Sequence, residues 1–280
     1  MPSIIVIGSV NLDIVASVER LPAPGETVTD ADLNRFPGGK GANQALAARR
    51  LGADVRLIAC VGEDAAADEA LALLREGGVA LDNCHATAAA PTGTALISVA
   101  RSGENHIVVA PGANRLLTPD LLALPAADAL ICQLEIPTDT VAQAARDFDG
   151  FFCANLAPAM HVDVAVLQRA DLIVVNEVEA AWYGESLSAC TGMIATTFGA
   201  AGAVLSKNGE DLARAKPPRI NAVDTTAAGD TFTAALTVAL VEGQDPEDAL
   251  QFACAAGAAA ATRLGAQPSL PTRDEVLALL

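Results

Sequence analysis

The segment Asp224–Phe232 (DTTAAGDTF) has the composition of a phosphate-binding turn that starts a helix. Its small residues leave several backbone N–H groups free at the positive end of the helix dipole, where an anion binds. Asp230 falls in the first helical turn, so its carboxylate is placed to take a proton from a hydroxyl group held before those N–H groups. An acid at a helix start is also common for structural reasons, so position alone leaves both interpretations open.

A second candidate is the glycine-rich turn Gly38–Gln44 (GGKGANQ). Three glycines within four residues let a backbone approach a ligand closely before a helix begins. The turn is not a Walker A motif, because Lys40 is followed by glycine rather than by Ser or Thr. No G-x-G-x-x-G follows the first strand, which disfavours a dinucleotide-binding oxidoreductase. A purely structural turn remains the alternative for this segment.

Polar residues also occur where strands are expected to end. Asn176 and Glu179 follow the apolar run Leu172–Val175, and ligands of open α/β sheets gather at the carboxyl ends of strands. The alternative is a solvated helix start. Near the N-terminus, Asn11 and Asp13 alternate with apolar residues, which would place both side chains on one face of a strand.

Apolar runs that alternate with helical segments predict a parallel sheet with helices on both faces. The segment Gly93–Pro111 differs, because two short strands flank a polar connection there and form an inserted hairpin. Two long C-terminal helices are expected at about Gly229–Glu242 and Pro246–Leu264. The first should be amphipathic, with a core-facing stripe of Phe232, Leu236, Ala239 and Leu240. Residues 1–280 are expected to form one α/β domain.

The chain of 280 residues carries a formal net charge of −17, which makes nucleic acid and anionic membranes poor partners. Hydrophobic residues form 52% of it, enough for a large core. Its six cysteines include no C-x-x-C pair and are expected to be unpaired thiols of a reducing compartment. No signal-peptide pattern and no apolar run of about 18 residues is present, so a cytoplasmic location is expected.

Taken together, these motifs strongly resemble the ribokinase (PfkB) family of sugar and nucleoside kinases. The resemblance runs nearly end to end and is carried by four motifs in the family's order. These are Gly8 with Asn11 and Asp13, GGKGAN at 38–43, NEVE at 176–179 and DTTAAGDTF at 224–232. PAPGETV at 22–28, QLEIP at 133–137 and TRLGAQPS at 262–269 add to it and point to the ribokinase branch.

The resemblance implies a ribokinase-like three-layer α/β/α sandwich with a mainly parallel central sheet and a small β-sheet lid over a sugar site. The lid would come from about 14–37 and 92–111, which includes the inserted hairpin. In such proteins the lids of two subunits clasp, so a homodimer is implied. The reaction implied is ATP-dependent phosphorylation of a sugar, with D-ribose as the first expectation.

The family pattern also assigns roles to residues. Asp230 would be the general base, and the backbone amides of Ala227, Ala228, Gly229 and Asp230 would form an anion hole for the transferring phosphoryl group. The residues expected to hold the sugar are Asn11, Asp13, Gly39, Lys40, Asn43, Glu135 and Asp230.

Cofactor positions are implied in the same way. Asn176 and Glu179 would organise Mg²⁺, Glu179 through water, and the loop carrying Thr197, Gly199 and Gly202 would lie beside ATP. An activating K⁺ would tether the 224–230 loop. Its matching positions, several acting through backbone carbonyls, are Asp224, Thr226, Ala260, Arg263, Gly265 and Ser269.

The chain departs from the family pattern at Gly184–Met193, which is shorter than usual and contains weak helix formers. The core would be less well covered on that face, and nucleotide affinity would differ. Two alternatives therefore stay open. One is a kinase of another acceptor on the same fold, such as deoxyribose or a nucleoside. The other is a non-catalytic sugar-binding regulator.

Overall fold

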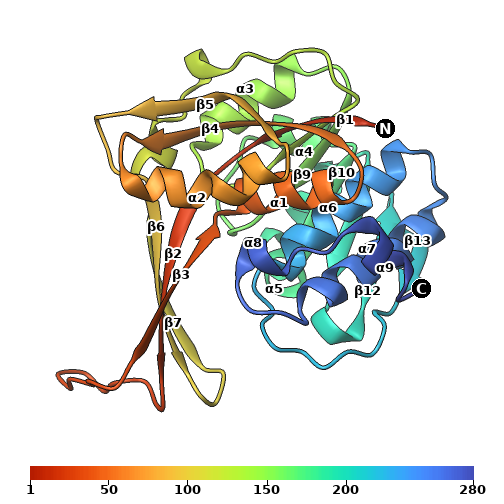
Figure 1. The fold of residues 1–280 in the computed structure, drawn as a ribbon. Coiled ribbons are helices and arrows are strands. Elements are labelled where there is room, and N and C mark those ends of the chain that lie inside the picture. Colours follow the sequence, from red (N-terminus) through yellow and green to blue (C-terminus); the bar gives the residue numbers. More distant parts are fainter.

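A nine-stranded, mainly parallel sheet runs through the centre of the computed structural model, which describes residues 1–280 (Figure 1). β12 pairs antiparallel with β11 and with the edge strand β13, and all other pairs of this sheet are parallel. In spatial order they are β13 (Glu210–Ala215), β12 (Ala203–Lys207), β11 (Met193–Thr197), β10 (Leu172–Asn176), β9 (Phe151–Asn155), β8 (Ala129–Cys132), β1 (Ser3–Ile7), β4 (Asp54–Gly62) and β5 (Ala80–Thr87).

Helices cover both faces of the sheet and enclose two hydrophobic cores. The alternation of side chains along β1 shows the division, because Ile4 and Val6 join one core whereas Ile5 and Ile7 join the other. The first face carries α1 (Lys40–Arg50), α2 (Ala65–Glu76), α6 (Ala228–Val241), α7 (Pro246–Ala260), α8 (Ala266–Ser269) and α9 (Arg273–Leu277). The second carries α3 (Thr138–Asp147), α4 (Val164–Arg169) and α5 (Glu177–Tyr183).

Four short 3₁₀ helices complete the connections, η1 (Gly112–Leu116), η2 (Pro119–Leu121), η3 (Gly184–Ala189) and η4 (Gly199–Ala201). No helix combines the length and the apolar character needed to cross a bilayer. All six cysteines are unpaired, as the sequence predicts, and five of them are buried.

A separate four-stranded sheet projects from the body as a twisted arm (Figure 1). Its strands, in spatial order, are β3 (Asp32–Gly38), β2 (Asn11–Val18), β6 (Gly93–Ala100) and β7 (Asn105–Ala110). The central pair β2 and β6 is parallel, and the outer pairs are antiparallel. The three helix–sheet–helix layers and this small sheet confirm the expected fold class.

The expectation that the helix after Gly229 is amphipathic is wrong. All residues of α6 from Asp230 to Ala239 are buried, and only Leu240 of the expected stripe is partly exposed. The helix lies between α1 and α7 and against β8 and β9, so no face reaches solvent. Its threonines are tolerated there because Thr231, Thr233 and Thr237 donate their hydroxyl groups to carbonyls four residues earlier.

Elements that were not foreseen from the sequence include β5, β13, α4 and α8. β5 (ALDNCHAT) and β13 (EDLARA) are edge strands of mixed polarity, so neither has the apolar run of a central strand. The short segment 184–193 forms η3, and the neighbouring β11 is thinly covered, since only Ala195 of that strand is fully buried.

Asp64 links α2 to the connection that enters the small sheet. Its carboxylate accepts a hydrogen bond from the backbone N–H of Ala67 at 2.9 Å, which caps the helix. It also accepts from the Thr92 backbone N–H at 2.8 Å and from the Thr92 hydroxyl at 2.7 Å. The same hydroxyl oxygen accepts the N–H of Gly62 at 2.9 Å. One carboxylate therefore holds the end of β4, the start of α2 and the base of β6 together.

Replacing Asp64 with alanine is therefore expected to lower the free energy of unfolding by about 1–3 kcal/mol, the sum of a lost helix cap and the hydrogen bonds to Thr92. Urea denaturation measures this change. Asp68→Ala is the matched control on the same helix, because its side chain is 80% exposed and forms only a 3.4 Å ion pair with Arg75. Equal losses in the two variants would contradict the linking role of Asp64.

Candidate active site

Most of the candidate residues meet at the carboxyl edge of the central sheet. Asn176 is the last residue of β10 and lies beside Thr197, the last residue of β11, in the strand register. Asn155 ends β9, and Glu135 lies just beyond β8. The starts of β2, α1 and α6 approach the same edge, which is where open parallel sheets bind their ligands.

Asp230 is held by helix α1 rather than by its own helix. The N-cap of α6 is Ala227, and no side chain caps this end. The Asp230 carboxylate is only 7% exposed and accepts hydrogen bonds from Asn43 Nδ2 and Gln44 Nε2, both at 2.9 Å. The simple helix-start interpretation therefore does not account for Asp230. Two amide groups 186 and 187 residues away in the chain orient this carboxylate instead.

The backbone at the start of α6 presents free N–H groups next to that carboxylate. Ala227 adopts a left-handed conformation with φ of 61°, which turns the chain into the helix. The N–H of Ala228 bonds to the Thr225 carbonyl at 3.2 Å, whereas those of Gly229 and Asp230 have no acceptor within the protein. Unpaired N–H groups at a helix N-terminus are suited to an anion.

Glycines in the 38–41 turn are required by close backbone contacts. Gly39 has φ of +89°, and a Cβ there would lie 2.7 Å from the Asn11 nitrogen. A Cβ on Gly38 would lie 2.2 Å from Asp13 Oδ2, and one on Gly41 would lie 2.5 Å from the carbonyl carbon of Gly8. These clashes would involve backbone atoms or the carboxylate of Asp13, which is expected to bind the sugar. The turn can therefore bring Asn11 and Asp13 against the start of α1 only because its glycines have no side chains.

Lys40 is the one cation among several carboxylates. Burial lowers the pKa of its ammonium group, but attraction to the surrounding carboxylates outweighs burial and leaves that pKa above its ordinary value. These carboxylates, in decreasing order of influence, are Asp230, Glu135, Glu179 and Asp13. Lys40 is therefore a fixed positive charge at the centre of the site, where a phosphoryl group would need one.

Residues that no sequence motif singled out hold two of the expected sugar-binding side chains, Glu135 and Asn11, in place. Ser9 donates its hydroxyl to Glu135 Oε2 at 2.5 Å, and the Lys40 N–H donates to the same oxygen at 3.2 Å. Asn114 donates Nδ2 to Asn11 Oδ1 at 2.8 Å and accepts the Val10 N–H at 2.9 Å. Asn114 lies in the segment GANRLLTP at 112–119, whose residue types do not indicate that Asn11 is its partner.

Asn176 and Glu179 form a capping box at the start of α5. Asn176 Oδ1 accepts the Glu179 N–H, and Glu179 Oε2 accepts the Asn176 N–H, each at 2.8 Å. The structural alternative for these residues is therefore realised, but Glu179 Oε1 has no hydrogen-bond donor in the protein. Burial raises the pKa of Glu179, and Lys40 and the backbone bond oppose this rise. One free carboxylate oxygen fits a Mg²⁺ that keeps most of its waters.

The expected nucleotide loop follows β11 directly. The N–H of Phe198 bonds to the Gly202 carbonyl at 2.8 Å and closes the loop around η4. Gly199 and Gly202 both have positive φ, and a Cβ on Gly202 would lie 2.1 Å from the Ala215 carbonyl oxygen. Thr197 ends β11 beside Asn176, so this loop and the α5 capping box share one edge of the site.

The expected cation positions form a cluster beside the 224–230 loop. Asp224 Oδ1 accepts the N–H and the hydroxyl of Thr226, at 2.9 and 2.6 Å, and Asp224 Oδ2 accepts the Gly265 N–H at 2.9 Å. The backbone N–H groups of Val223 and Asp224 both bond to the Ala261 carbonyl, next to Ala260. Carboxylate, hydroxyl and carbonyl oxygens suit an alkali cation.

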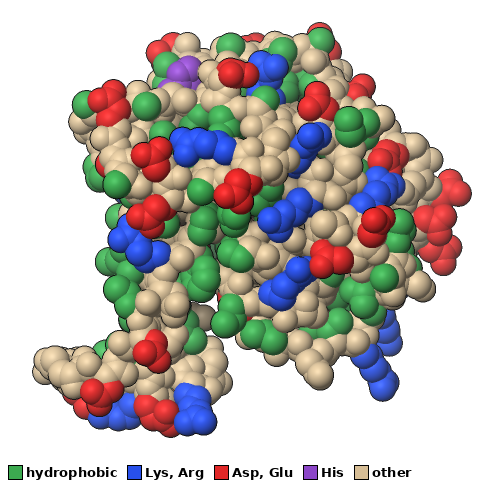
Figure 2. Space-filling model, in the orientation of Figure 1, with side chains coloured by type: hydrophobic (Ala, Val, Ile, Leu, Met, Phe, Trp, Pro, Cys, Tyr) green, Lys and Arg blue, Asp and Glu red, His purple; other side chains and the backbone are tan.

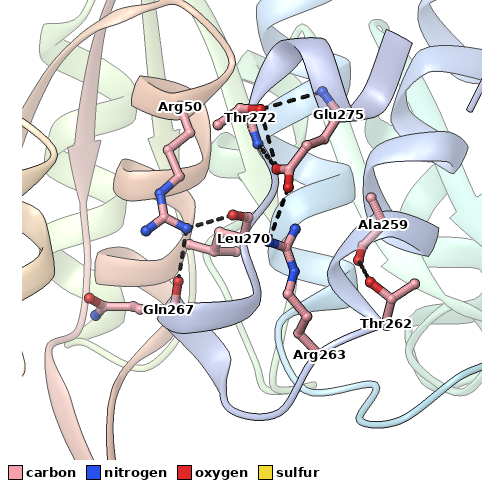
Figure 3. A network of polar contacts seen from close by, with 8 residues as sticks. All are labelled: Arg50, Ala259, Thr262, Arg263, Gln267, Leu270, Thr272 and Glu275. Carbon is pink, nitrogen blue, oxygen red and sulfur yellow. Dashed lines mark hydrogen bonds and ion pairs between the residues drawn. The ribbon is translucent and has the colours of Figure 1, made fainter. Parts of the chain in front are cut away.

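Two of the six cation positions face away or are already engaged. The Arg263 guanidinium pairs with Glu275 at 3.1 Å and points toward α9, as Figure 3 shows, so only its carbonyl is available to an ion. The Ser269 hydroxyl donates to the Ala266 carbonyl at 2.8 Å. Arg50 of α1 donates to the carbonyls of Gln267 and Leu270, and these hydrogen bonds connect the segment around Ser269 to α1 (Figure 3).

Comparison with known proteins assigns the fold and the site to a family. The model described as "pfkB family carbohydrate kinase" matches residues 1–273. The chain belongs to the pfkB family of carbohydrate kinases. As a family member it is a kinase that phosphorylates a sugar hydroxyl group.

Individual relatives of this family member agree with that assignment. It is 37% identical over 294 residues to the ribokinase of Bacillus subtilis, with all of both chains covered. It is 37% identical to the ribokinase of Haemophilus influenzae, over 98% of this chain and 97% of the relative. The ribokinase structure of Thermotoga maritima matches with a TM-score of 0.91 and 35% identity, over 100% and 99% of the two chains. The structure of Arabidopsis thaliana ribokinase complexed with ribose and ATP matches with a TM-score of 0.88 and 31% identity, over 99% of this chain and 98% of the other.

The ionised form of Asp13 is electrostatically unfavourable in this kinase site. Burial is the main reason that its pKa rises to about 7, and repulsion from Glu135 and Asp230 adds to the rise while Lys40 opposes it. A folded-state pKa above the unfolded value means that the folded state favours the protonated carboxyl. The stability associated with this group is fully present below about pH 4 and is lost as the pH rises through 7.

Asp13→Asn is accordingly expected to stabilise the protein by about 2–4 kcal/mol at pH 8, because the buried charge is removed. The gain should shrink as the pH falls towards 5. The same variant tests the expected contact of Asp13 with the sugar, because loss of a hydrogen-bond acceptor for that sugar should raise its KM about tenfold or more. Urea denaturation at the two pH values and steady-state kinetics measure these effects. A variant that is less stable than the original chain at pH 8 would refute the buried-charge account.

Proposed function

We propose that the chain transfers the γ-phosphoryl group of ATP to the primary hydroxyl of D-ribose, with Asp230 as the general base. The observation that carries the proposal is the placement of Asp230, whose buried carboxylate lies beside the unpaired N–H groups of Gly229 and Asp230. A base and an anion site then stand next to each other, as in-line transfer from a phosphate to a hydroxyl requires. The ribokinase relatives, one of them complexed with ribose and ATP, support this choice of substrates.

The sugar would lie between the small sheet and the start of α1. Polar side chains on these elements have hydrogen-bonding groups left for hydroxyls, since Asn114 occupies only the Oδ1 atom of Asn11. Asn43 Oδ1 is buried and has no partner, so a sugar hydroxyl can supply its missing donor. Besides Asn11 and Asn43, the proposed sugar-binding residues are Asp13, Gly39, Lys40, Glu135 and Asp230.

The chemical step would follow from these positions. Asp230 accepts the proton of the primary hydroxyl as that oxygen attacks the γ-phosphorus, and the bond from this phosphorus to the β–γ bridging oxygen breaks to release ADP. The free backbone N–H groups of Gly229 and Asp230 and the Lys40 ammonium stabilise the negative charge that spreads over the transferring group, whereas the Ala228 N–H is already bonded to the Thr225 carbonyl. ATP would lie along the carboxyl edge of the sheet towards Thr197, Gly199 and Gly202.

Two cations would assist through this chain's own residues. Mg²⁺ would neutralise phosphate charge when bound with the nucleotide, and the free Glu179 Oε1 would orient it through water. K⁺ would bind at the cluster around Asp224, where it would fix the 224–230 loop without touching the sugar. Kinase assays with K⁺, Na⁺ or neither test the second role, and equal rates in all three would refute it.

A second copy of the chain is proposed to pack on the small sheet. Large apolar side chains are exposed on it, and Figure 2 shows such side chains along the projecting arm. They are Leu33, Leu96, Ile107, Val108 and Val109. An exposed apolar surface of this kind usually marks an interface. Light scattering at assay concentrations should give twice the chain mass, and a monomer would contradict this part of the proposal.

Asp230→Asn is expected to lower kcat by about 10²–10⁴-fold, which is the usual contribution of a general base. Ribose and ATP should still bind, because the amide keeps the size and most contacts of the carboxylate. Coupled ADP-release kinetics and calorimetry separate the two effects. Turnover close to that of the original chain would remove Asp230 from the role of base.

The acceptor is tested by a panel of sugars and nucleosides with ATP, Mg²⁺ and K⁺. Ribose should give the highest kcat/KM, ahead of deoxyribose, fructose and adenosine. Rapid turnover of another acceptor with none on ribose would overturn the substrate and leave the kinase assignment intact. Sugar binding without ATP binding would instead indicate a regulator.

A further inference from the structure

A chain of buried amide groups runs behind the Asp230 carboxylate. Gln133 Nε2 donates to Gln44 Oε1 at 2.6 Å, and Gln44 Nε2 donates to Asp230 Oδ1 and to Asn155 Oδ1, both at 2.9 Å. Asn155 Nδ2 in turn donates to the Val174 carbonyl at 3.2 Å. Gln44 and Gln133 are fully buried. These hydrogen bonds therefore connect the Asp230 carboxylate to strands β9 and β10 and to the end of β8.

The contacts of Gln44 allow only one orientation of its amide. In the observed orientation its oxygen receives a donor and both of its N–H bonds point at acceptors. Rotating the amide by 180° would turn the oxygen towards the Asp230 carboxylate and the Asn155 oxygen. Three acceptors would then face one another in a buried space, which is strongly unfavourable.

The backbone makes room for this arrangement. A Cβ on Gly8 would lie 1.9 Å from Gln133 Oε1, so any side chain at position 8 would displace Gln133. Gly8 comes directly after β1, and Gly41 of α1 packs against it. Gly8 thus leaves space for Gln133, the glutamine that orients Gln44, and Gly41 lets α1 pack directly on the backbone of Gly8.

We propose that Gln44 is the positioning residue of the Asp230 base. Its amide fixes Oδ1 of the carboxylate, which leaves Oδ2 on the side of Asn43 and the proposed sugar. Because Gln44 is neutral, it orients the carboxylate without forming an ion pair that would weaken it as a base. Gln44 itself touches neither sugar nor nucleotide in this arrangement.

The inference rests on the proposed function, since it assumes that Asp230 is the base, and two substitutions at position 44 test it. Gln44→Met removes the donor at similar size, and Gln44→Glu replaces the donor with a negative charge. The charged groups that interact with Asp230, namely Asp13, Lys40 and Glu179, are unchanged in both variants, and Gln44→Glu adds one carboxylate to them. Gln143→Met, on the outer helix α3, is the control.

Both variants should keep the KM values for ribose and ATP within about threefold while kcat falls about 10–100-fold, as expected when a charge-assisted hydrogen bond is lost. The acid limb of the kcat–pH profile should move to higher pH in Gln44→Met and further in Gln44→Glu, because the ionised carboxylate first loses a donor and then gains a repelling neighbour. Gln143→Met should behave like the original chain.

A purely structural role predicts a lower melting temperature with an unshifted pH profile, and that result would overturn the inference. If Asp230→Asn is inactive while both Gln44 variants retain full kcat, the inference fails and the proposed function stands. If Asp230→Asn is active, the proposed function fails first. If the Gln44 variants do not fold, Gln133→Met tests the orientation of Gln44 instead, because it removes the donor to Gln44 Oε1. A fall in kcat smaller than that of the Gln44 variants is expected, and an unchanged kcat would contradict the proposal.

If none of the variants folds, a measurement on the unaltered protein still tests the inference. In protein labelled with ¹⁵N at glutamine side chains, one buried amide pair should shift with the midpoint of the acid limb of kcat. A spectrum in which no buried glutamine amide responds over that pH range would overturn the inference.

Discussion

The site depends on holding one carboxylate, that of Asp230, in place where it is almost completely buried. A buried charge is unfavourable unless hydrogen bonds and opposite charge replace its hydration. For Asp230 this replacement comes from Asn43 and Gln44 of α1 and from the nearby Lys40 ammonium. Because these donors lie on the helix that begins in the glycine turn, the position of α1 against α6 determines the orientation of the proposed base.

That helix pair explains several other features of the fold. Helix α6 is buried on every side because it lies between α1, α7 and the sheet, and alanines and internally bonded threonines make such packing possible. The glycines at 38, 39 and 41 allow the strand β2 and the start of α1 to meet without clashes. Through Arg50, α1 also holds the carbonyls of Gln267 and Leu270, so the proposed cation cluster and the proposed sugar site share one helix.

The sequence predicted the parts of the molecule that are encoded by local pattern. The strand before Gly8, the glycine turn before α1, the hairpin of the small sheet and the motif around Asp230 all have short-range signatures of type and spacing. The amide chain through Gln44 was missed because the three side-chain hydrogen bonds of Gln44 join residues that are 89, 111 and 186 positions apart, and only packing brings them together. The edge strands β5 and β13 lacked an apolar run, and the complete burial of α6 followed from its neighbours rather than from its own pattern.

The central claim is that the Asp230 carboxylate is aimed at the hydroxyl that receives phosphate. A crystal structure of the chain with ribose and a non-hydrolysable ATP analogue tests this claim most directly. The account predicts that the primary hydroxyl of the sugar lies within about 3.2 Å of Asp230 Oδ2, with Gln44 still bonded to Oδ1. A hydroxyl bound by another base, with the Asp230 side chain turned away from the sugar, would contradict it.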